Sequence, residues 1–175
     1  MVMEVIKKIK TKQSVVSMIV RVCALILLIF FFLPTVGISC EGEKIADISG
    51  IGAATGTVLV ENSSGEKEKA DDVNAAVWLF IMPILTIATA VFISKKELVA
   101  VACSAANLIM MCIFNAAVKG WVKKNYESYA DYLDVEPTAI FSLYIILCVV
   151  IILTVVIDKY VIKPGKLKAF LQEIK

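Results

Sequence analysis

Residues 30–56, FFFLPTVGISCEGEKIADISGIGAATG, mark the point at which the character of this chain changes. The stretch begins in the most apolar part of a long hydrophobic run, and Pro34 interrupts that run. Because proline lacks a backbone donor and breaks or kinks a helix, we expect the first helix to end here. Ser39, Cys40 and acidic residues follow, and then the small residues of Ser49–Gly56.

The composition of the chain is that of a membrane protein. Of its 175 residues 59% are hydrophobic, whereas soluble domains have about 45–50%. A membrane-spanning helix needs about 20 predominantly apolar residues. Four segments meet this requirement: Val15–Val36, Ala75–Ser94, Leu98–Val118 and Thr138–Ile157. We therefore expect an all-α membrane protein, in which residues 1–175 form a single four-transmembrane-helix bundle with a small extracytoplasmic cap.

The charges predict how the chain is oriented. Lysines cluster before the first apolar segment, between the second and third, and after the fourth, whereas acidic residues outnumber lysines in loops 37–74 and 119–137. By the positive-inside rule, this is a multi-pass protein of the cell membrane with cytoplasmic N- and C-termini and both longer loops outside. The first segment is too long for a signal peptide, and no A-x-A-like cleavage site follows Pro34, so we expect an uncleaved anchor.

The basic segments at the two ends of the chain are candidates for contact with the lipid bilayer. Residues 1–14 place apolar and lysine side chains on different helical faces, and a similar amphipathic pattern recurs after Lys163-Pro-Gly. Such segments bind anionic lipid headgroups at the cytoplasmic face. The lysines could instead serve only to set the topology.

Three polar residues lie within the predicted spans. Arg21 is near the cytoplasmic edge of the first span, so it can extend to the headgroups, although intramembrane charge also marks functional sites. Asn107 and Asn115 lie in the third span. Amides there form hydrogen bonds between helices, and the alternative is that they line a pathway.

The sequence contains no constellation typical of catalysis or metal binding. Histidine is absent, and the five cysteines form no C-x-x-C pair. We therefore expect no enzymatic activity, no catalytic residue, no cofactor and no metal site, and no nucleic-acid partner. Cys40 is the one cysteine predicted outside a span. It could bridge to another chain, carry a modification, or simply be packed.

The first outer loop contains the candidate interaction residues Cys40, Ser49, Gly50, Gly52 and Gly56. The three glycines follow a G-x-G-x-x-x-G spacing without Gly-Lys-Ser/Thr, so flexibility or close packing is favoured over phosphate binding. Residues 45–48 and 57–60 could form short strands, and Ser49–Gly56 could equally form a helical turn.

Part of the loop resembles an element found in small bacterial multi-span membrane proteins. The element consists of Phe32-Leu-Pro-Thr-Val, Ser39-Cys40-x-Gly42, Ser49-Gly50 and Ala54-Thr55-Gly56. Some of those proteins carry an N-terminal zinc ribbon that this chain lacks. The resemblance implies a bacterial plasma-membrane protein and supplies no activity.

Two hypotheses for function follow. The first is a non-enzymatic membrane protein with an accessory, sensory or assembly role, which presents its outer loop to a partner in the membrane or outside it. The second is a self-associating pore, either holin-like or a subunit of a channel or transporter. In the second case the chain would form a homo-oligomer along the small residues Ala102 and Ala106 of the third span.

Overall fold

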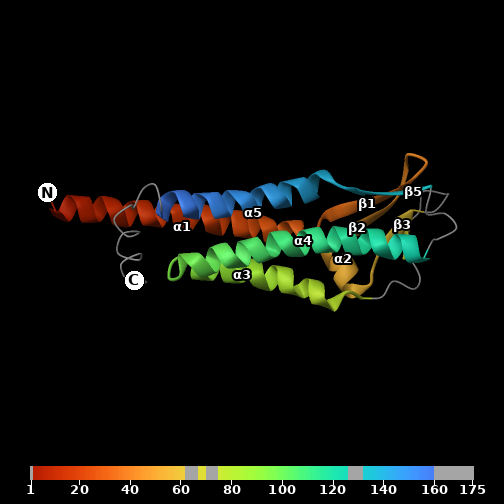
Figure 1. Ribbon diagram of the computed structural model, residues 1–175, viewed down its shortest axis with the longest axis horizontal. Coiled ribbons are helices and arrows are strands. Elements are labelled where there is room, and N and C mark those ends of the chain that lie inside the picture. Colours follow the sequence, from red (N-terminus) through yellow and green to blue (C-terminus); the bar gives the residue numbers. More distant parts are fainter. Residues whose placement is uncertain (1, 62–66, 70–74, 126–131, 160–175) are drawn as a thin grey trace, which may run out of the picture.

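The computed structural model describes residues 2–61, 67–69, 75–125 and 132–159. In chain order the elements are α1 (Val2–Phe30), β1 (Pro34–Cys40), β2 (Glu43–Ser49), α2 (Gly50–Thr55), β3 (Leu59–Glu61), β4 (Lys67–Lys69), the 3₁₀ helix η1 (Val77–Phe80), α3 (Ile81–Phe92), α4 (Glu97–Asn125), β5 (Leu133–Pro137) and α5 (Ala139–Ile157). The long helices lie side by side, and the sheet forms one end of the molecule (Figure 1). The start of α1, the α3–α4 turn and the end of α5 lie at the opposite end.

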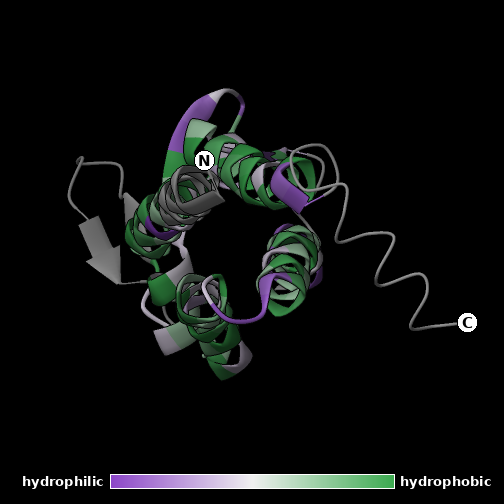
Figure 2. Ribbon diagram, turned by 90° about the vertical axis from the view of Figure 1, so that its left-hand side faces the viewer, coloured by the Kyte–Doolittle hydropathy of each residue, from purple (hydrophilic) through white to green (hydrophobic). Residues whose placement is uncertain are grey.

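Helices α1, α3, α4 and α5 form a closed ring. Helix α1 contacts α3 and α5, and α4 contacts the same two helices on the other side, as Figure 2 shows from the end that carries the N-terminus. Large side chains that point inward are almost fully buried, namely Leu27, Met111, Tyr144 and Ile151. Apolar side chains also cover the outer surface, where Met18, Leu25, Ile84, Ile109 and Leu153 are more than half exposed. Helices that are apolar all round are typical of a lipid environment.

The five strands form one antiparallel sheet in the order β4-β3-β2-β1-β5. Strands β2, β1 and β5 make up most of it, and the three-residue strands β3 and β4 extend one edge. Strand β1 is paired on both sides, with β2 from Pro34↔Ser49 to Cys40↔Glu43 and with β5 from Val36↔Pro137 to Cys40↔Leu133. Strand β1, which is an interior strand of the sheet, therefore joins an early and a late part of the described chain.

The change from helix to strand occurs within four residues. Helix α1 ends at Phe30, a turn follows at Phe31, and β1 begins at Pro34. Proline cannot donate to the helix and disfavours helical geometry in the residue before it. Thr35 and Val36 are consequently buried in the strand and do not continue the helix.

The start of α5 is hydrogen-bonded to the start of β1. The hydroxyl of Thr138 donates to the carbonyl of Pro34 at 2.8 Å, and its backbone N–H donates to the carbonyl of Thr35 at 3.0 Å. These two bonds fix the position at which α5 leaves the sheet.

The prediction of an all-α, four-transmembrane-helix bundle was wrong. The sheet is built from the end of the first predicted span and from both predicted loops. In the described part of the chain, two helices are long and apolar enough to cross a membrane, Glu97–Lys124 and Ala139–Ile157. The apolar helices Val15–Phe30 and Val77–Phe92 have between 10 and 17 residues. At about 1.5 Å per residue, apolar stretches of that length are shorter than about 30 Å of hydrocarbon, although α1 itself continues back to Val2.

The two predicted outer loops contain strands and helical segments, whereas a small cap of mostly irregular chain was expected. Residues 37–74 hold most of β1 together with β2, α2, β3 and β4, and residues 119–137 hold the end of α4 and β5. The predicted short strands at 45–48 and 57–60 correspond to β2 and in part to β3, and the predicted helical turn at Ser49–Gly56 corresponds to α2. The fourth predicted span agrees with α5 except at Thr138, which is the N-cap residue.

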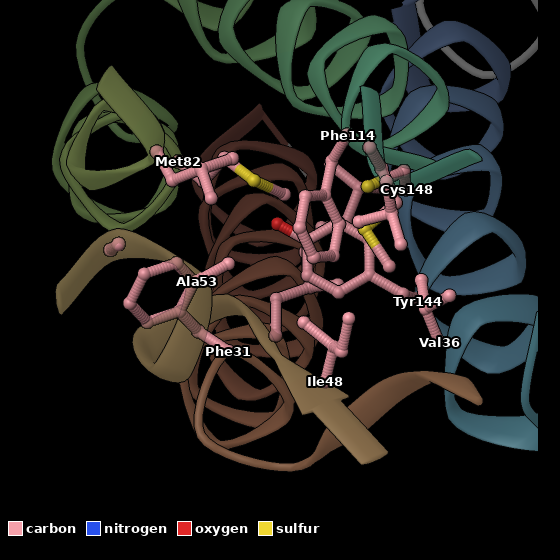
Figure 3. Close-up of a cluster of buried hydrophobic side chains, with 14 of the residues drawn as sticks. Phe31, Val36, Ile48, Ala53, Met82, Phe114, Tyr144 and Cys148 are labelled. Atoms are coloured by element: carbon pink, nitrogen blue, oxygen red, sulfur yellow. The ribbon is translucent and has the colours of Figure 1, made fainter. Parts of the chain in front are cut away.

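Helix α2 rests directly on the end of α1. The backbone N–H of Ile51 donates to the carbonyl of Phe31 at 3.0 Å. A Cβ atom at Gly50 would lie 2.5 Å from a ring carbon of Phe31, and that ring is also 6.3 Å from the ring of Phe80. Figure 3 shows Phe31 beside Ala53 in the buried cluster. Only glycine at position 50 permits this approach.

We expect the substitution Gly50→Ala to destabilise the protein by about 1–3 kcal/mol, because the buried Phe31 ring must shift to accommodate the methyl group. The measurement is the thermal unfolding midpoint of the protein purified in detergent micelles.

Gly120→Ala is the matched control. Gly120 lies within α4, and an added Cβ would meet nothing within 4 Å. Alanine is favoured over glycine inside a helix by roughly 0.5–1 kcal/mol, so this variant should melt at the same temperature or higher. An unfolding midpoint for Gly50→Ala equal to that of Gly120→Ala would contradict the proposed contact.

Candidate functional site

The small residues singled out in the sequence come together in α2. Ser49 is the N-cap residue, and its Oγ accepts a hydrogen bond from the N–H of Gly52 at 3.0 Å. Gly56 ends the helix with φ 69°, a left-handed conformation that favours glycine. A Cβ atom at Gly52 would lie 2.8 Å from the carbonyl oxygen of Thr57. Each residue thus has a local structural role, and partner binding by this segment stays a prediction.

Cys40 lies away from α2, at the opposite end of the β1–β2 hairpin. It pairs with Glu43 beside the turn, whereas Ser49 pairs with Pro34 at the helical end of the same strands. Its thiol is free and partly exposed. The turn after it contains Glu41 and Gly42, both with positive φ. The structure therefore separates Cys40 from the other candidate interaction residues.

The end of the sheet around Cys40 is acidic. The side chains of Glu41, Glu43, Asp134 and Glu136 are exposed on the hairpin and on β5. Lys44 is the neighbouring cation, and it forms an ion pair with Asp47 at 2.7 Å. Among the described side chains of the β1–β2 hairpin and β5, this ion pair leaves the exposed carboxylates as the main charge.

Arg21 bridges α1 and the end of α3. Its Nη2 donates to Ser94 Oγ at 2.8 Å, and its Nε donates to the carbonyl oxygen of Ala90 at 3.4 Å. The hydroxyls of Ser17 and Ser94 are 2.9 Å apart. Arg21 is therefore held in place by neutral groups close to the α3–α4 turn.

Asn107 belongs to a polar layer inside the ring of helices. Its amide lies 2.8 Å from the hydroxyl of Thr86 on α3. When the side-chain oxygen of Asn107 faces Thr86 and accepts from it, the side-chain nitrogen of Asn107 donates to the carbonyl oxygen of Met82 at 3.1 Å. Asn107 is 1% exposed. It connects two helices, as the interhelical interpretation predicted.

Asn115 does not take part in this layer. It lies two turns further along α4, is half-buried, and its side-chain oxygen is buried without a hydrogen-bond partner among the described residues. Arg21, Asn107 and Asn115 thus occupy three separate levels of the molecule.

The rest of the polar layer was not recognised from the sequence. Ser104 Oγ donates to the carbonyl oxygen of Cys148 at 3.2 Å, and Tyr144 is hydrogen-bonded to Thr86. Tyr144 and Cys148 are both buried, and Figure 3 places them on the opposite side of the apolar cluster from Phe31. Tyr144 and Cys148 are four positions apart, and Ser104 and Asn107 are three positions apart. Each pair therefore lies on one face of its helix, which could have indicated a shared inward surface.

Two cavities accompany these elements. One of about 130 Å³ lies between the sheet and the helices and is lined by apolar groups, including Trp78, Phe114 and Trp121. The other has about 500 Å³ and lies at the end of the α3–α4 turn, where Arg21, Glu97 and Asp158 line it together. Glu97 and Asp158 are two carboxylates of this second cavity that sequence reasoning missed.

No group of three or more His, Cys, Asp or Glu side chains able to hold a metal ion occurs within residues 2–61, 67–69, 75–125 and 132–159. The side chains of the basic segments predicted to contact lipid, residues 1–14 and the segment after Lys163-Pro-Gly, lie outside the part of the chain that the structure describes.

Comparisons of the chain with protein-family models, with curated protein sequences and with solved structures found no match.

We expect Asn107→Leu to lower the stability of the protein by roughly 0.6–2 kcal/mol, because it removes the link between α3 and α4 and leaves the buried Thr86 hydroxyl without this partner. Asn115→Leu is the matched control and should be neutral or stabilising, since its side-chain oxygen is already buried without a partner. Thermal unfolding in detergent compares the two. A larger loss of stability for Asn115→Leu than for Asn107→Leu would contradict the assignment.

Proposed function

We propose that this chain is a non-enzymatic membrane protein that presents its sheet to a partner outside the cytoplasm, in an accessory, sensory or assembly role. Helices α4 and α5 cross the cell membrane, with α1 and α3 packed against them. The end that carries the α3–α4 turn faces the cytoplasm. If the resemblance of the first outer loop to a bacterial element is a true relationship, the membrane is the bacterial plasma membrane.

The distribution of charge supports this orientation. Lys95 and Lys96 are exposed in the α3–α4 turn, and Lys159 follows α5 at the same end. The exposed charges of β1, β2, their turn and β5 are mostly acidic, and the last turns of α4 add the exposed Lys119, Lys123 and Lys124 at this end. Lysines are concentrated on the cytoplasmic side of membrane proteins, so the sheet belongs outside and both termini belong inside.

The observation that carries the proposed role is the way in which the sheet is attached to the helices. Ile51 is hydrogen-bonded to Phe31 at the end of α1, and the N–H of Ala76 donates to the carbonyl oxygen of Ala53 at 2.9 Å just before η1. Thr138 makes a third connection at the start of α5. A force or a ligand that acts on the sheet is therefore transmitted to several helices, as a sensory or assembly role requires.

The chemistry of the sheet defines the kind of partner. The exposed carboxylates of Glu41, Glu43, Asp134 and Glu136 attract a basic surface and would repel an acidic one. The partner is accordingly a protein with clustered Lys or Arg side chains outside the cytoplasm.

The rival pore hypothesis makes a different prediction. Asn107 bonds to Thr86 inside a single chain, so this residue is not available to line a path between copies. Ion flux through liposomes that contain the purified, folded wild-type protein would favour the pore over the accessory role.

We expect a membrane-impermeant maleimide to label Glu41→Cys in intact cells and to label Lys96→Cys only after the membrane is permeabilised. Both substitutions are made in a Cys40→Ser background, which also reports the labelling of the cysteines within the helices. Both positions are exposed. Labelling of Lys96→Cys in intact cells would reverse the orientation and refute the proposal.

We expect crosslinking from Cys40 in intact cells to capture a basic protein, and the double substitution of Glu43→Lys with Glu136→Lys to reduce that capture at least about tenfold, because the attraction becomes repulsion. Lys96→Glu, a charge reversal at the other end of the molecule, is the control and should leave the yield unchanged. Capture that survives the reversal of both carboxylates would show that the acidic surface does not select the partner.

A further inference from the structure

The cavity of about 500 Å³ at the cytoplasmic end is the strongest feature that the proposed function does not use. It is lined from α1, from the α3–α4 turn, from the first residue of α4 and from the residue that follows α5. Its wall combines a guanidinium, two hydroxyls and two carboxylates with apolar side chains. A cavity of this size and mixed polarity matches the sites that hold small molecules with one polar end.

The polar wall contains the donors that a phosphate group requires. Arg21 uses one Nη2 bond and one Nε bond on neutral groups, Ser94 Oγ and the carbonyl oxygen of Ala90. A guanidinium has five N–H donors and forms forked hydrogen bonds to phosphate oxygens. The hydroxyls of Ser17 and Ser94 lie next to it. The three side chains can therefore surround one anionic group.

The two carboxylates restrict which phosphate compound can enter. Glu97 and Asp158 line the same cavity, Asp158 is 3% exposed, and both interact with other groups of the protein. Their negative charges oppose a phosphate dianion and favour a phosphodiester that also carries an ammonium group. The charge pattern of the wall thus corresponds to a zwitterion.

The apolar wall supplies a place for a hydrocarbon chain. Met18, Val22 and Leu25 line the cavity from α1 and are 67%, 46% and 60% exposed. Residues spaced by four and three positions share one face of a helix, so they form a stripe that begins at the cavity and follows α1 toward the sheet. A ligand with a polar head and an apolar tail would contact both surfaces.

From these contacts we infer that the cavity binds a zwitterionic phospholipid of the ethanolamine type. Its phosphodiester contacts Arg21, Ser17 and Ser94, its ammonium group faces Glu97 and Asp158, and the first part of an acyl chain lies along Met18, Val22 and Leu25. The cavity lies at the level that the proposed orientation assigns to the cytoplasmic headgroups. Binding in detergent does not depend on that orientation, so the two proposals can fail separately.

The test measures binding of short-chain phosphatidylethanolamine with a fluorescent acyl chain to the purified full-length protein in micelles. We expect saturable binding to the wild type. Arg21→Gln should weaken the affinity about 10–100-fold, which corresponds to the loss of hydrogen bonds to a charged group. Lys96→Gln removes an exposed cation at the same end of the molecule that does not line the cavity, and it should change the affinity less than about twofold.

A second pair of variants guards against a loss of folding in Arg21→Gln. Leu25→Trp fills the apolar part of the cavity and should also weaken binding about tenfold by steric exclusion. Ile19→Trp places the same side chain at a position on α1 that is 43% exposed and outside the cavity, and it should bind as the wild type does. Equal affinity of Leu25→Trp and Ile19→Trp would overturn the site.

Competition distinguishes the possible sources of the phosphate. Unlabelled phosphatidylethanolamine should displace the probe, whereas phosphatidylglycerol with the same chains should compete at least about tenfold less well. Phosphoethanolamine or inorganic phosphate that competes as well as the lipid would show a site for soluble phosphate compounds and overturn the inference. Equal competition by phosphatidylglycerol, unchanged binding in Arg21→Gln, or no saturable binding to the wild type would also overturn it.

Discussion

The contact between Phe31 and Gly50 determines how the rest of the molecule is assembled. Phe31 is the first residue beyond α1, and its carbonyl accepts the N–H of Ile51 while its ring covers Gly50. Helix α2 can therefore lie on the end of α1, and its Ala53 then receives the N–H of Ala76 at the start of the next helical segment. These contacts hold the sheet and the ring of helices together at the end of α1.

Polar contacts inside the ring give the helices their relative positions. In a bilayer, where we propose that this ring lies, apolar side chains gain little from packing against each other instead of against lipid, and hydrogen bonds and close packing then specify the arrangement. Asn107 with Thr86 links α4 to α3, and Ser104 with the carbonyl oxygen of Cys148 links α4 to α5. The buried polar layer thus links α4 to both of its neighbours in the ring.

The two ends of the molecule differ in chemistry, and the proposed roles follow from that difference. The sheet exposes carboxylates around the β1–β2 turn, which favours recognition of a basic protein surface. The opposite end combines Arg21, hydroxyls and carboxylates in a cavity beside an apolar stripe, which favours a phospholipid headgroup. The sheet is joined to α1 and α5 by the hydrogen bonds of Ile51 and Thr138, and the same two helices contribute to the wall of the cavity.

The sequence by itself determined which segments are helical and apolar, because hydropathy and helix periodicity depend on neighbouring residues. It placed α5 to within one residue and identified Asn107 as a link between helices. Leu133 and Val135 alternate with Asp134 and Glu136, which is a local pattern typical of a strand. A search for long apolar segments does not detect this pattern. Only the tertiary structure decided that Pro34–Cys40 is an interior strand paired with both β2 and β5 and that Arg21, Glu97 and Asp158 share a cavity. The physical reason is that these contacts join distant residues, such as Pro34 and Thr138, which are 104 positions apart, and no local pattern encodes such a pairing.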